Sequence, residues 1–196
     1  HGRLHGQRRI AGAEGVILGV APLSGIAAEN LVMGLIPALT RAQKCEAIAA
    51  ALAEMSALGI TSTTDPALGS GGDNYQGGLL GSDCIGAYQD LLDEGRLKVR
   101  VNILYLFGQY GANSLADLQA ALPQLGFHSG FGNEKLQIGG VKIFADGTPP
   151  NRTAWMSEDY LGGGRWSLML PGETDEQRAW ELERMIRYAH GRGFQV

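Results

Sequence analysis

The chain has 196 residues, of which 44% are apolar and 18% are charged, and its formal net charge is −4. This length and apolar content can build the core of one globular domain and exclude a disordered chain. Lys and Arg are scattered along a mildly acidic sequence, which excludes the basic surface that nucleic acid binding requires. The 30 glycines follow no collagen period, so they predict many tight loops.

Two cysteines and one apolar stretch bear on the cellular compartment. Two cysteines cannot form a disulfide scaffold, and Cys45 falls on the apolar stripe of a predicted helix, which favours reduced, buried thiols. Arg8 and Arg9 precede apolar residues 15–28, as in a secretory signal, but glycines and a proline interrupt that stretch. It is also too short to cross a bilayer. We therefore expect a cytoplasmic protein with no membrane partner.

The ends of the chain predict how it is organised. Residues 1–28 are expected to form an irregular N-terminal segment or part of an insertion, and residues 29–196 to form one domain. The sequence begins at His1 and stops at Val196, directly after a strand-like segment has begun. A natural domain seldom ends there, because the backbone groups of that strand would lack partners. We therefore expect a fragment of a longer protein.

Helix and strand patterns alternate from residue 40 onward. Capping boxes open the first and last predicted helices, and glycines end them. The strands between them are too apolar to have one wet face, which is typical of a parallel sheet covered by helices, so the fold class is α/β. Periodicity alone leaves an open doubly wound sheet and a partial barrel both open. The predicted order is helix Thr40–Gly59, strand Ile60–Asp65, helix Asp83–Gly95, strand Leu97–Phe107, helix Ser114–Leu122, strand Leu136–Ala145, helix Thr174–Gly193 and a final strand Gly193–Val196.

Several common active-site motifs are absent from the sequence. The glycine-rich run at 69–72 has the wrong spacing for a dinucleotide fingerprint or a P-loop, and no Gly-x-Ser-x-Gly elbow occurs. The four histidines have no ligand-like companions, whereas a zinc site needs three or four donors. They are His1, His5, His128 and His190.

Lys142 is the strongest candidate for a functional residue. In a strand, Val141 and Ile143 would share a helix-packing face, so Lys142 would point the other way, toward a barrel or sheet centre. An ammonium group buried there would be costly unless it paired with a carboxylate, acted as a base or Schiff-base amine, or was modified. It also lies near the carboxyl end of its strand, where α/β enzymes place their sites. The alternative is an edge strand with Lys142 in water, paired with Asp146.

The loop after this strand supplies further candidates. Asp146 opens the loop, Arg152 could hold a carboxylate or polarise a carbonyl, and Trp155 could line an apolar pocket. Asp65 follows another predicted strand, where it is either a site residue or the first turn residue before Pro66.

The stretch around Lys142 resembles the amidohydrolase superfamily, and its closest branch is amidohydrolase family 3, which includes N-substituted formamide deformylase. The resemblance runs from about Glu29 to Val196. The matching segments are Gly140-Val141-Lys142-Ile143-Phe144-Ala145-Asp146-Gly147-Thr148, Arg152-Thr153-Ala154, Leu58-Gly59-Ile60-Thr61-Ser62 and Val99-Arg100-Val101.

The resemblance implies that residues 29–196 are part of a (β/α)₈ TIM barrel, comprising about strands 2 to 4 with their helices and the start of strand 5. The family's fourth-strand lysine is often carboxylated and bridges two divalent metals, and Lys142 matches it. The implied cofactor is a divalent metal, Zn²⁺ above all, as one or two ions. The implied reaction is hydrolysis of a C–N, amide-like bond by metal-activated water. Asp146, Arg152 and Trp155 would then contact the small-molecule substrate.

The family's histidine and aspartate ligands would lie before His1 or after Val196, so the isolated chain is expected to be inactive.

Two other interpretations stay open at this point. A non-catalytic α/β binding or assembly domain, derived from a decayed barrel, would need no metal. A barrel enzyme using Lys142 as a Schiff-base amine is a third interpretation. The sequence leaves the oligomeric state open, a homo-oligomer included.

Overall fold

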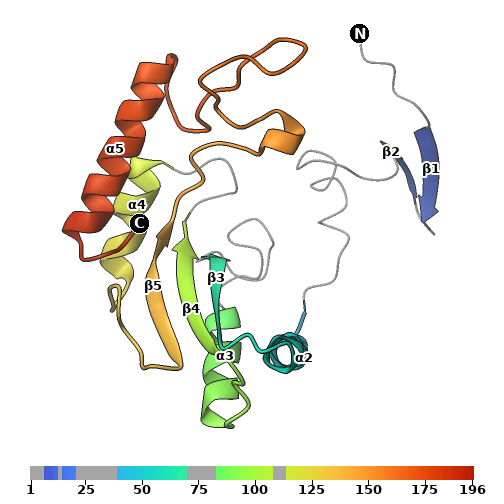
Figure 1. The fold of residues 1–196 in the computed structure, drawn as a ribbon, viewed down its shortest axis with the longest axis vertical. Helices are drawn as coiled ribbons and strands as arrows, with labels where there is room; N and C mark the ends of the chain where they lie inside the picture. The colour runs from blue at the N-terminus through green and yellow to red at the C-terminus, as the bar shows by residue number, and fades with distance from the viewer. Residues whose placement is uncertain (1–6, 13–14, 21–38, 70–82, 108–113) are drawn as a thin grey trace. The chain divides into compact units, whose positions relative to one another are not determined.

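The computed structural model describes residues 7–12, 15–20, 39–69, 83–107 and 114–196 (Figure 1). The chain divides into two units, His1–Ala38 and Leu39–Val196. In the first unit, β1 (Gln7–Gly12) and β2 (Gly15–Val20) pair antiparallel as a hairpin, with Ile10 opposite Ile17. A boundary at residue 28 stays a prediction.

The second unit holds a three-stranded parallel sheet in the order β3-β4-β5. Figure 1 shows the three strands running side by side with their arrowheads at one end. The α/β class predicted from the sequence is confirmed. The strands are β3 (Ser62–Gly69), β4 (Arg100–Leu106) and β5 (Leu136–Lys142), and the helices are α2 (Arg41–Ala57), α3 (Asp83–Asp93), α4 (Leu115–Ala121) and α5 (Asp175–Gly191), with short 3₁₀ turns η1 (Leu122–Gln124) and η2 (Pro149–Asn151).

The helix ends follow the sequence closely because local hydrogen bonds determine them. Both predicted capping boxes are present, at Thr40 with Gln43 and at Thr174 with Gln177. Gly59, Gly95 and Gly193 follow the helix ends with positive φ angles of 83°, 68° and 84°, which glycine adopts without strain.

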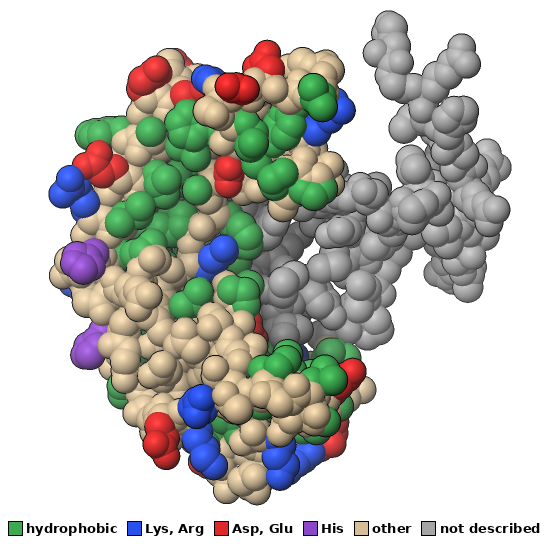
Figure 2. Space-filling model, in the orientation of Figure 1, with side chains coloured by type: hydrophobic (Ala, Val, Ile, Leu, Met, Phe, Trp, Pro, Cys, Tyr) green, Lys and Arg blue, Asp and Glu red, His purple; other side chains and the backbone are tan. Residues whose placement is uncertain are grey.

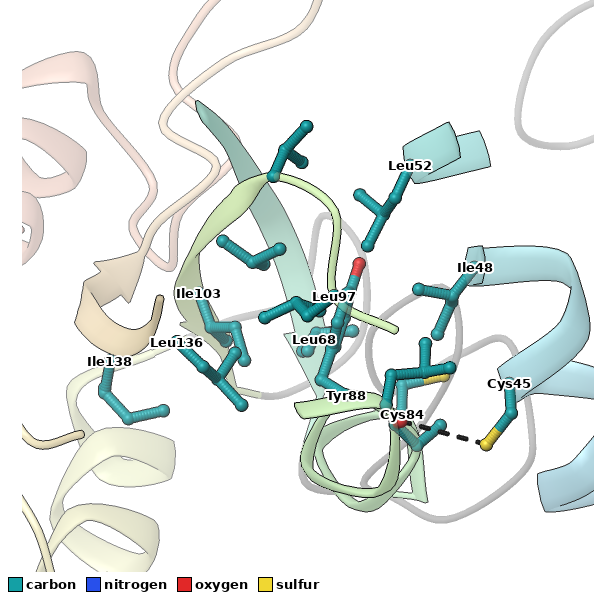
Figure 3. Packing of buried hydrophobic residues seen from close by; sticks show 14 residues of the cluster. Cys45, Ile48, Leu52, Leu68, Cys84, Tyr88, Leu97, Ile103, Leu136 and Ile138 are labelled. Atoms are coloured by element: carbon teal, nitrogen blue, oxygen red, sulfur yellow. Dashed lines mark hydrogen bonds between the residues drawn. The ribbon is translucent and has the colours of Figure 1, made fainter. Parts of the chain in front are cut away.

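One face of the sheet carries the four helices of the described residues. Alternate residues of β4 are buried on this face, and they pack in two clusters, one with α2 and α3 and the other with α4 and α5. Figure 3 shows Leu52 and Ile48 of α2 directed toward Tyr88 and the sheet residues. Cys45 lies in the same cluster, with its Sγ 3.8 Å from the Ala87 carbonyl oxygen. Both cysteines are buried thiols outside any disulfide, as predicted.

The four predicted strands all differ from the structure in their bounds. The strand predicted over 60–65 starts at Ser62 and continues through Pro66 to Gly69. It can do so because the register shifts between Asp65 and Leu68, and a bulge tolerates a proline that has no N–H to donate. The strand predicted to reach Ala145 stops at Lys142, and the one predicted over 97–107 spans only Arg100–Leu106. The last four residues form no assigned strand, although Gln195 O accepts a hydrogen bond of 2.8 Å from Val141 N–H.

The helical period predicts a buried stripe of Leu182, Met185, Ile186 and Ala189 on the last helix, and this prediction is only partly correct. Met185 and Ala189 are buried, whereas Ile186 is exposed. The glycine-rich run at 69–72 lies outside the described part of the chain except for Gly69, and His1 and His5 lie wholly outside it. No helix among the described residues is long and apolar enough to cross a membrane.

The central position of Ile103 in β4 yields a stability prediction for the full-length protein. Ile103→Val removes one buried methyl group from a fully buried site and should lower the free energy of unfolding by about 1 kcal/mol. Urea unfolding monitored by circular dichroism measures this change. Leu58→Ala, at a side chain that is 74% exposed, is the control and should change it by less than about 0.5 kcal/mol. An equal effect of both substitutions would contradict the assigned core.

Candidate active site

The carboxyl ends of the three parallel strands meet at one edge of the sheet, and Lys142 is the last residue of β5 there. Lys142 pairs with Leu106 of β4, whereas its neighbour Val141 pairs with Tyr105 and belongs to the helix-covered core. Because successive side chains of a strand alternate between faces, Lys142 lies on the face opposite the helices. This agrees with the orientation that the sequence predicts.

A register shift in β5 produces this orientation. Ile138 pairs with Ile103, but Gly140 pairs with Leu104, so Gly139 is an extra residue between them. The shift keeps Ile138 and Val141 on the same face although they are three positions apart, an odd spacing that would place them on opposite faces of a regular strand. A Cβ atom at Gly139 would overlap the side-chain amide of Asn102, so glycine is required at this position.

The surroundings of Lys142 differ from those of a structural ion pair. Its side chain is half-buried, and Nζ lies 4.7 Å from the centroid of the Phe144 ring, which is a cation–π contact. Within the described residues no carboxylate lies at ion-pair distance from this ammonium group, and Asp146 does not pair with it. The same residues contain no group of three or more His, Cys, Asp and Glu side chains that could hold a metal ion.

Asp146 holds the loop that follows β5. Its Oδ2 accepts a hydrogen bond of 2.8 Å from the backbone N–H of Trp155. Inside this bridge, Gly147 N–H donates to Thr153 O at 2.9 Å and Thr148 N–H donates to Thr153 Oγ1 at 3.0 Å. A Cβ atom at Gly147 would overlap Thr153 Oγ1. The loop therefore closes on itself directly beyond Lys142.

Arg152 and Trp155 lie on this same loop and are exposed to solvent. Arg152 has a φ of 55°, and it is the only non-glycine residue with positive φ among the described residues. Its N–H bonds to Pro149 O at 2.9 Å, and its guanidinium lies close to Gly162. No carboxylate in the described part of the chain pairs with it. The three candidate substrate residues are thus brought onto one loop, but their contact with a substrate stays a prediction.

Asp65 lies in β3 rather than in a turn, although it retains turn-like bonding. Its Oδ1 accepts the N–H of Ala67 at 3.4 Å, and its Oδ2 accepts the hydroxyl of Tyr88 at 2.9 Å. Burial, followed by the nearby Asp65 charge and this hydrogen bond, raises the pKa of Tyr88. Tyr88 does not stand out in the sequence, because it occupies an ordinary apolar position of its helix.

Asn102 is a second polar residue that sequence reasoning missed. It lies on the uncovered face of β4, level with Thr64 and Gln137, along a groove of about 390 Å³. Its Oδ1 is buried and accepts no hydrogen bond from the described residues. Buried side-chain oxygens are normally paired, so this one is unusual. An asparagine in the middle of an otherwise apolar strand was the available signal.

The described histidines provide no ligand set. His128 is exposed, with Nδ1 2.8 Å from Ser129 O, and His190 is exposed in the last turn of α5.

Comparisons with known proteins fit this arrangement. The model of the amidohydrolase family matches residues 7–196, so the chain belongs to the amidohydrolase family. An uncharacterized metal-dependent hydrolase from Pyrococcus furiosus shares the fold with a TM-score of 0.60 and 24% identity, over 88% of this chain and 31% of that one. A second, from Pyrococcus horikoshii OT3, has a TM-score of 0.56 and 22% identity, over 86% of this chain and 29% of that one. This chain therefore spans about a third of each neighbour. No curated protein matches it.

The Asp146 bridge predicts different effects for two substitutions. Asp146→Ala leaves the Trp155 N–H without an acceptor and should lower the free energy of unfolding by about 1–2 kcal/mol, whereas Asp146→Asn keeps an oxygen acceptor and should lower it by less. Urea unfolding and limited proteolysis of the loop would measure both effects. Equal losses in the two variants would mean that the charge of Asp146, rather than its hydrogen bond, holds the loop.

The raised pKa of Tyr88 predicts a loss of stability at high pH. The folded protein keeps this hydroxyl protonated at pH values where it ionises in the unfolded chain. The contribution of the protonated Tyr88 hydroxyl to the free energy of unfolding is therefore complete below about pH 10, and it decreases as the pH rises further. Urea unfolding between pH 8 and pH 11 should show a smaller decrease in Tyr88→Phe than in the natural protein. If the free energy of unfolding decreased equally with pH in the natural protein and in Tyr88→Phe, Tyr88 would not be the group responsible for the loss.

Proposed function

We propose that the chain is one arc of a metal-dependent amidohydrolase that cleaves a C–N bond of an amide-like small molecule. The observation that carries this proposal is the place of Lys142, at the carboxyl end of a parallel strand, on the face away from the helices. That edge is where α/β enzymes bind their substrates. The branch we propose is that of N-substituted formamide deformylase.

The arrangement of helices supports a barrel rather than a doubly wound sheet. A doubly wound sheet has helices on both faces, whereas the β4 side chains that pack with α2 and α3 (Val101 and Ile103) and the one that packs with α4 and α5 (Tyr105) share one face. We propose that β3, β4 and β5 are strands 2 to 4 of a (β/α)₈ barrel. The hydrogen bond from Val141 N–H to Gln195 O supports the start of strand 5 at the other edge of β5.

Lys142 fits the role of one metal ligand. It is half-buried, it is free of a carboxylate partner among the described residues, and carboxylation would turn its ammonium group into an anionic oxygen donor. We propose one or two Zn²⁺ ions here, with the other ligands outside the described residues, so the isolated chain would be inactive. Bound zinc would supply a water of lowered pKa and polarise the substrate carbonyl.

The loop after β5 would position the substrate next to this residue. Asp146 fixes the backbone at Trp155, and the Arg152 guanidinium offers hydrogen-bond donors for a carbonyl or carboxylate oxygen. We propose Asp146, Arg152 and Trp155 as the substrate-binding residues, with Asp146 acting through the loop. The two buried, reduced thiols support a cytoplasmic location.

Replacement of Lys142 tests this proposal in the full-length protein. Lys142→Ala should remove most of the bound metal and lower kcat/KM for amide hydrolysis by at least about 100-fold. Metal analysis of the purified protein and amine release from a panel of N-substituted formamides measure the two effects. Arg192→Ala, at an exposed position directly after α5, is the control and should change neither.

A third measurement separates carboxylation from a structural role of Lys142. The natural protein prepared in ¹³C-bicarbonate should show a carbamate carbon resonance that is absent from Lys142→Ala. Full metal content and activity in Lys142→Ala would overturn the assignment of Lys142 as a ligand. A protein with no metal requirement at all would favour the non-catalytic domain instead.

A further inference from the structure

A pocket that the proposed reaction does not use lies at the amino edge of the sheet, at the end of the strands opposite Lys142. Its volume is about 290 Å³, and three cationic residues line it: Lys98, Arg100 and Lys135. Figure 2 shows Lys and Arg side chains at the lower end of the second unit, where Figure 1 places the amino ends of β4 and β5. We call this cavity the basic pocket.

Two of the three cations lie directly opposite each other on neighbouring strands. Arg100 is the first residue of β4, and Lys135 directly precedes β5. The pairing of Val101 with Leu136 continues to them, since the N–H of Val101 donates to Lys135 O at 2.7 Å. Like charges in such cross-strand positions repel each other and destabilise a sheet. An anion bound between them would replace this repulsion by attraction.

Carboxylates do not neutralise the basic pocket. In the part of the chain that the structure describes, no carboxylate oxygen lies within ion-pair distance of any of its three cations. Glu134 lines the adjoining groove together with Arg100, and the two side chains form no ion pair. Three cations around one pocket are a local excess of positive charge in a chain whose net charge is −4. This excess favours an anionic ligand.

Hydrogen bonds hold the cations of the basic pocket in place without a ligand. Asn133 Oδ1 accepts the backbone N–H of Lys135 at 2.8 Å. The backbone N–H of Arg100 donates to Thr61 O at 3.0 Å, and its Nη2 donates to Thr61 Oγ1 at 3.2 Å. The threonine therefore fixes the direction of the guanidinium group, which leaves its other N–H groups available to a ligand.

The rest of the lining combines apolar and hydroxyl groups. Leu97 and Val99 are buried in the core with α2 and α3, and Ile60 is 42% exposed, so these three give the pocket an apolar side. Ser56 lines it as well, and its hydroxyl can donate a hydrogen bond. A small molecule with an anionic end and a short apolar body matches these surfaces.

We propose that the basic pocket binds a small organic phosphate, with the phosphate group between Arg100 and Lys135 and the organic part against Leu97 and Val99. A phosphate group carries up to two negative charges and three acceptor oxygens, which suits three cations better than one carboxylate does. The proposal is independent of the proposed function, because it uses only residues at the edge of the sheet opposite Lys142.

Calorimetry on the full-length, metal-loaded protein tests the ligand class with phenyl phosphate, inorganic phosphate and benzoate. Phenyl phosphate should bind with a dissociation constant of about 1 mM or lower. Inorganic phosphate should bind about 10-fold more weakly because it lacks the apolar part, and benzoate about 10-fold more weakly because it carries one charge. Equal binding of inorganic phosphate would reject the organic ligand, and equal binding of benzoate would reject the phosphate group.

Substitutions that remove one charge locate the site. Lys135→Gln and Arg100→Gln should each weaken the binding of phenyl phosphate by about 10-fold or more. Arg192→Gln makes the same change in net charge at an exposed position outside the pocket, and it should change the affinity by less than about two-fold. Equal losses in Lys135→Gln and Arg192→Gln would overturn the site, because binding would then depend on net charge alone.

The melting temperature separates loss of the ligand from loss of the fold. Lys135→Gln removes the repulsion by Arg100, so without phosphate it should melt at the same temperature as the natural protein or higher. Addition of phenyl phosphate should then raise the melting temperature of the natural protein more than that of Lys135→Gln. A lower melting temperature of Lys135→Gln with an unchanged affinity would give Lys135 a structural role and overturn the proposal.

A divalent metal near Lys142 could also bind phosphate, and one more variant distinguishes the two places. Lys142→Ala should keep its affinity for phenyl phosphate within about two-fold, because Lys142 lies at the other edge of the sheet. Binding that is lost in Lys142→Ala and kept in Lys135→Gln would place the phosphate at the metal instead of the basic pocket. That outcome would overturn the proposal and leave the proposed function standing.

Discussion

The pairing of β5 with β4 shifts by one residue at Gly139, and the place of Lys142 depends on that shift. With uninterrupted alternation, Ile138 and Lys142 would lie on the same face, and the ammonium group would enter the core among the helices. The extra residue instead keeps Ile138 and Val141 together in the apolar core and directs Lys142 to the other face. Glycine makes this arrangement sterically feasible because the Asn102 amide occupies the space where a Cβ would lie.

The two faces of the sheet differ in chemistry: one packs the core, and the other carries polar groups. The helix-covered face is apolar and fully packed, with side chains such as Val101 and Ile103 almost inaccessible to solvent. The opposite face carries hydroxyl and amide groups, including the buried Asn102 Oδ1 that accepts no hydrogen bond from the described residues. In the proposed barrel this second face is the interior, where other strands of the protein would supply the missing donor. One face of the sheet therefore provides the apolar packing that stabilises it, and the other face carries the groups of the candidate site.

The long connection from β5 to α5 keeps its shape through its own hydrogen bonds. Asp146 holds Trp155, Thr153 closes the turn that contains Arg152, and the Met169 N–H returns to the end of β5. These bonds allow exposed tryptophans to be held near the strand end without support from a helix or sheet. Long loops with little regular structure are commonly functional. The connection from β5 to α5 begins at the carboxyl edge of the sheet, and this position brings it next to Lys142.

Features encoded by neighbouring residues could be predicted from the sequence alone. The capping boxes at Thr40 and Thr174, the helix stops at Gly59 and Gly193, and the α/β class all depend on local hydrogen bonds and hydrophobic period. The orientation of Lys142 was also predictable, because it lies between Val141 and Ile143, two apolar residues that share one face of a strand. The amidohydrolase family was recognised from the motif around Lys142, and the family match confirms it.

Only the tertiary structure decided the features that depend on contacts between distant segments. Pro66 continues β3 because a bulge against β4 accepts it, although its local preference is for a turn. Asp146 holds a loop rather than facing open solvent, because Trp155 folds back to it. Tyr88 meets Asp65, and Asn102 meets Gly139, only when strands and helices distant in sequence are packed together. Local patterns specify elements and their faces, whereas partners of polar side chains arise from packing across the sheet.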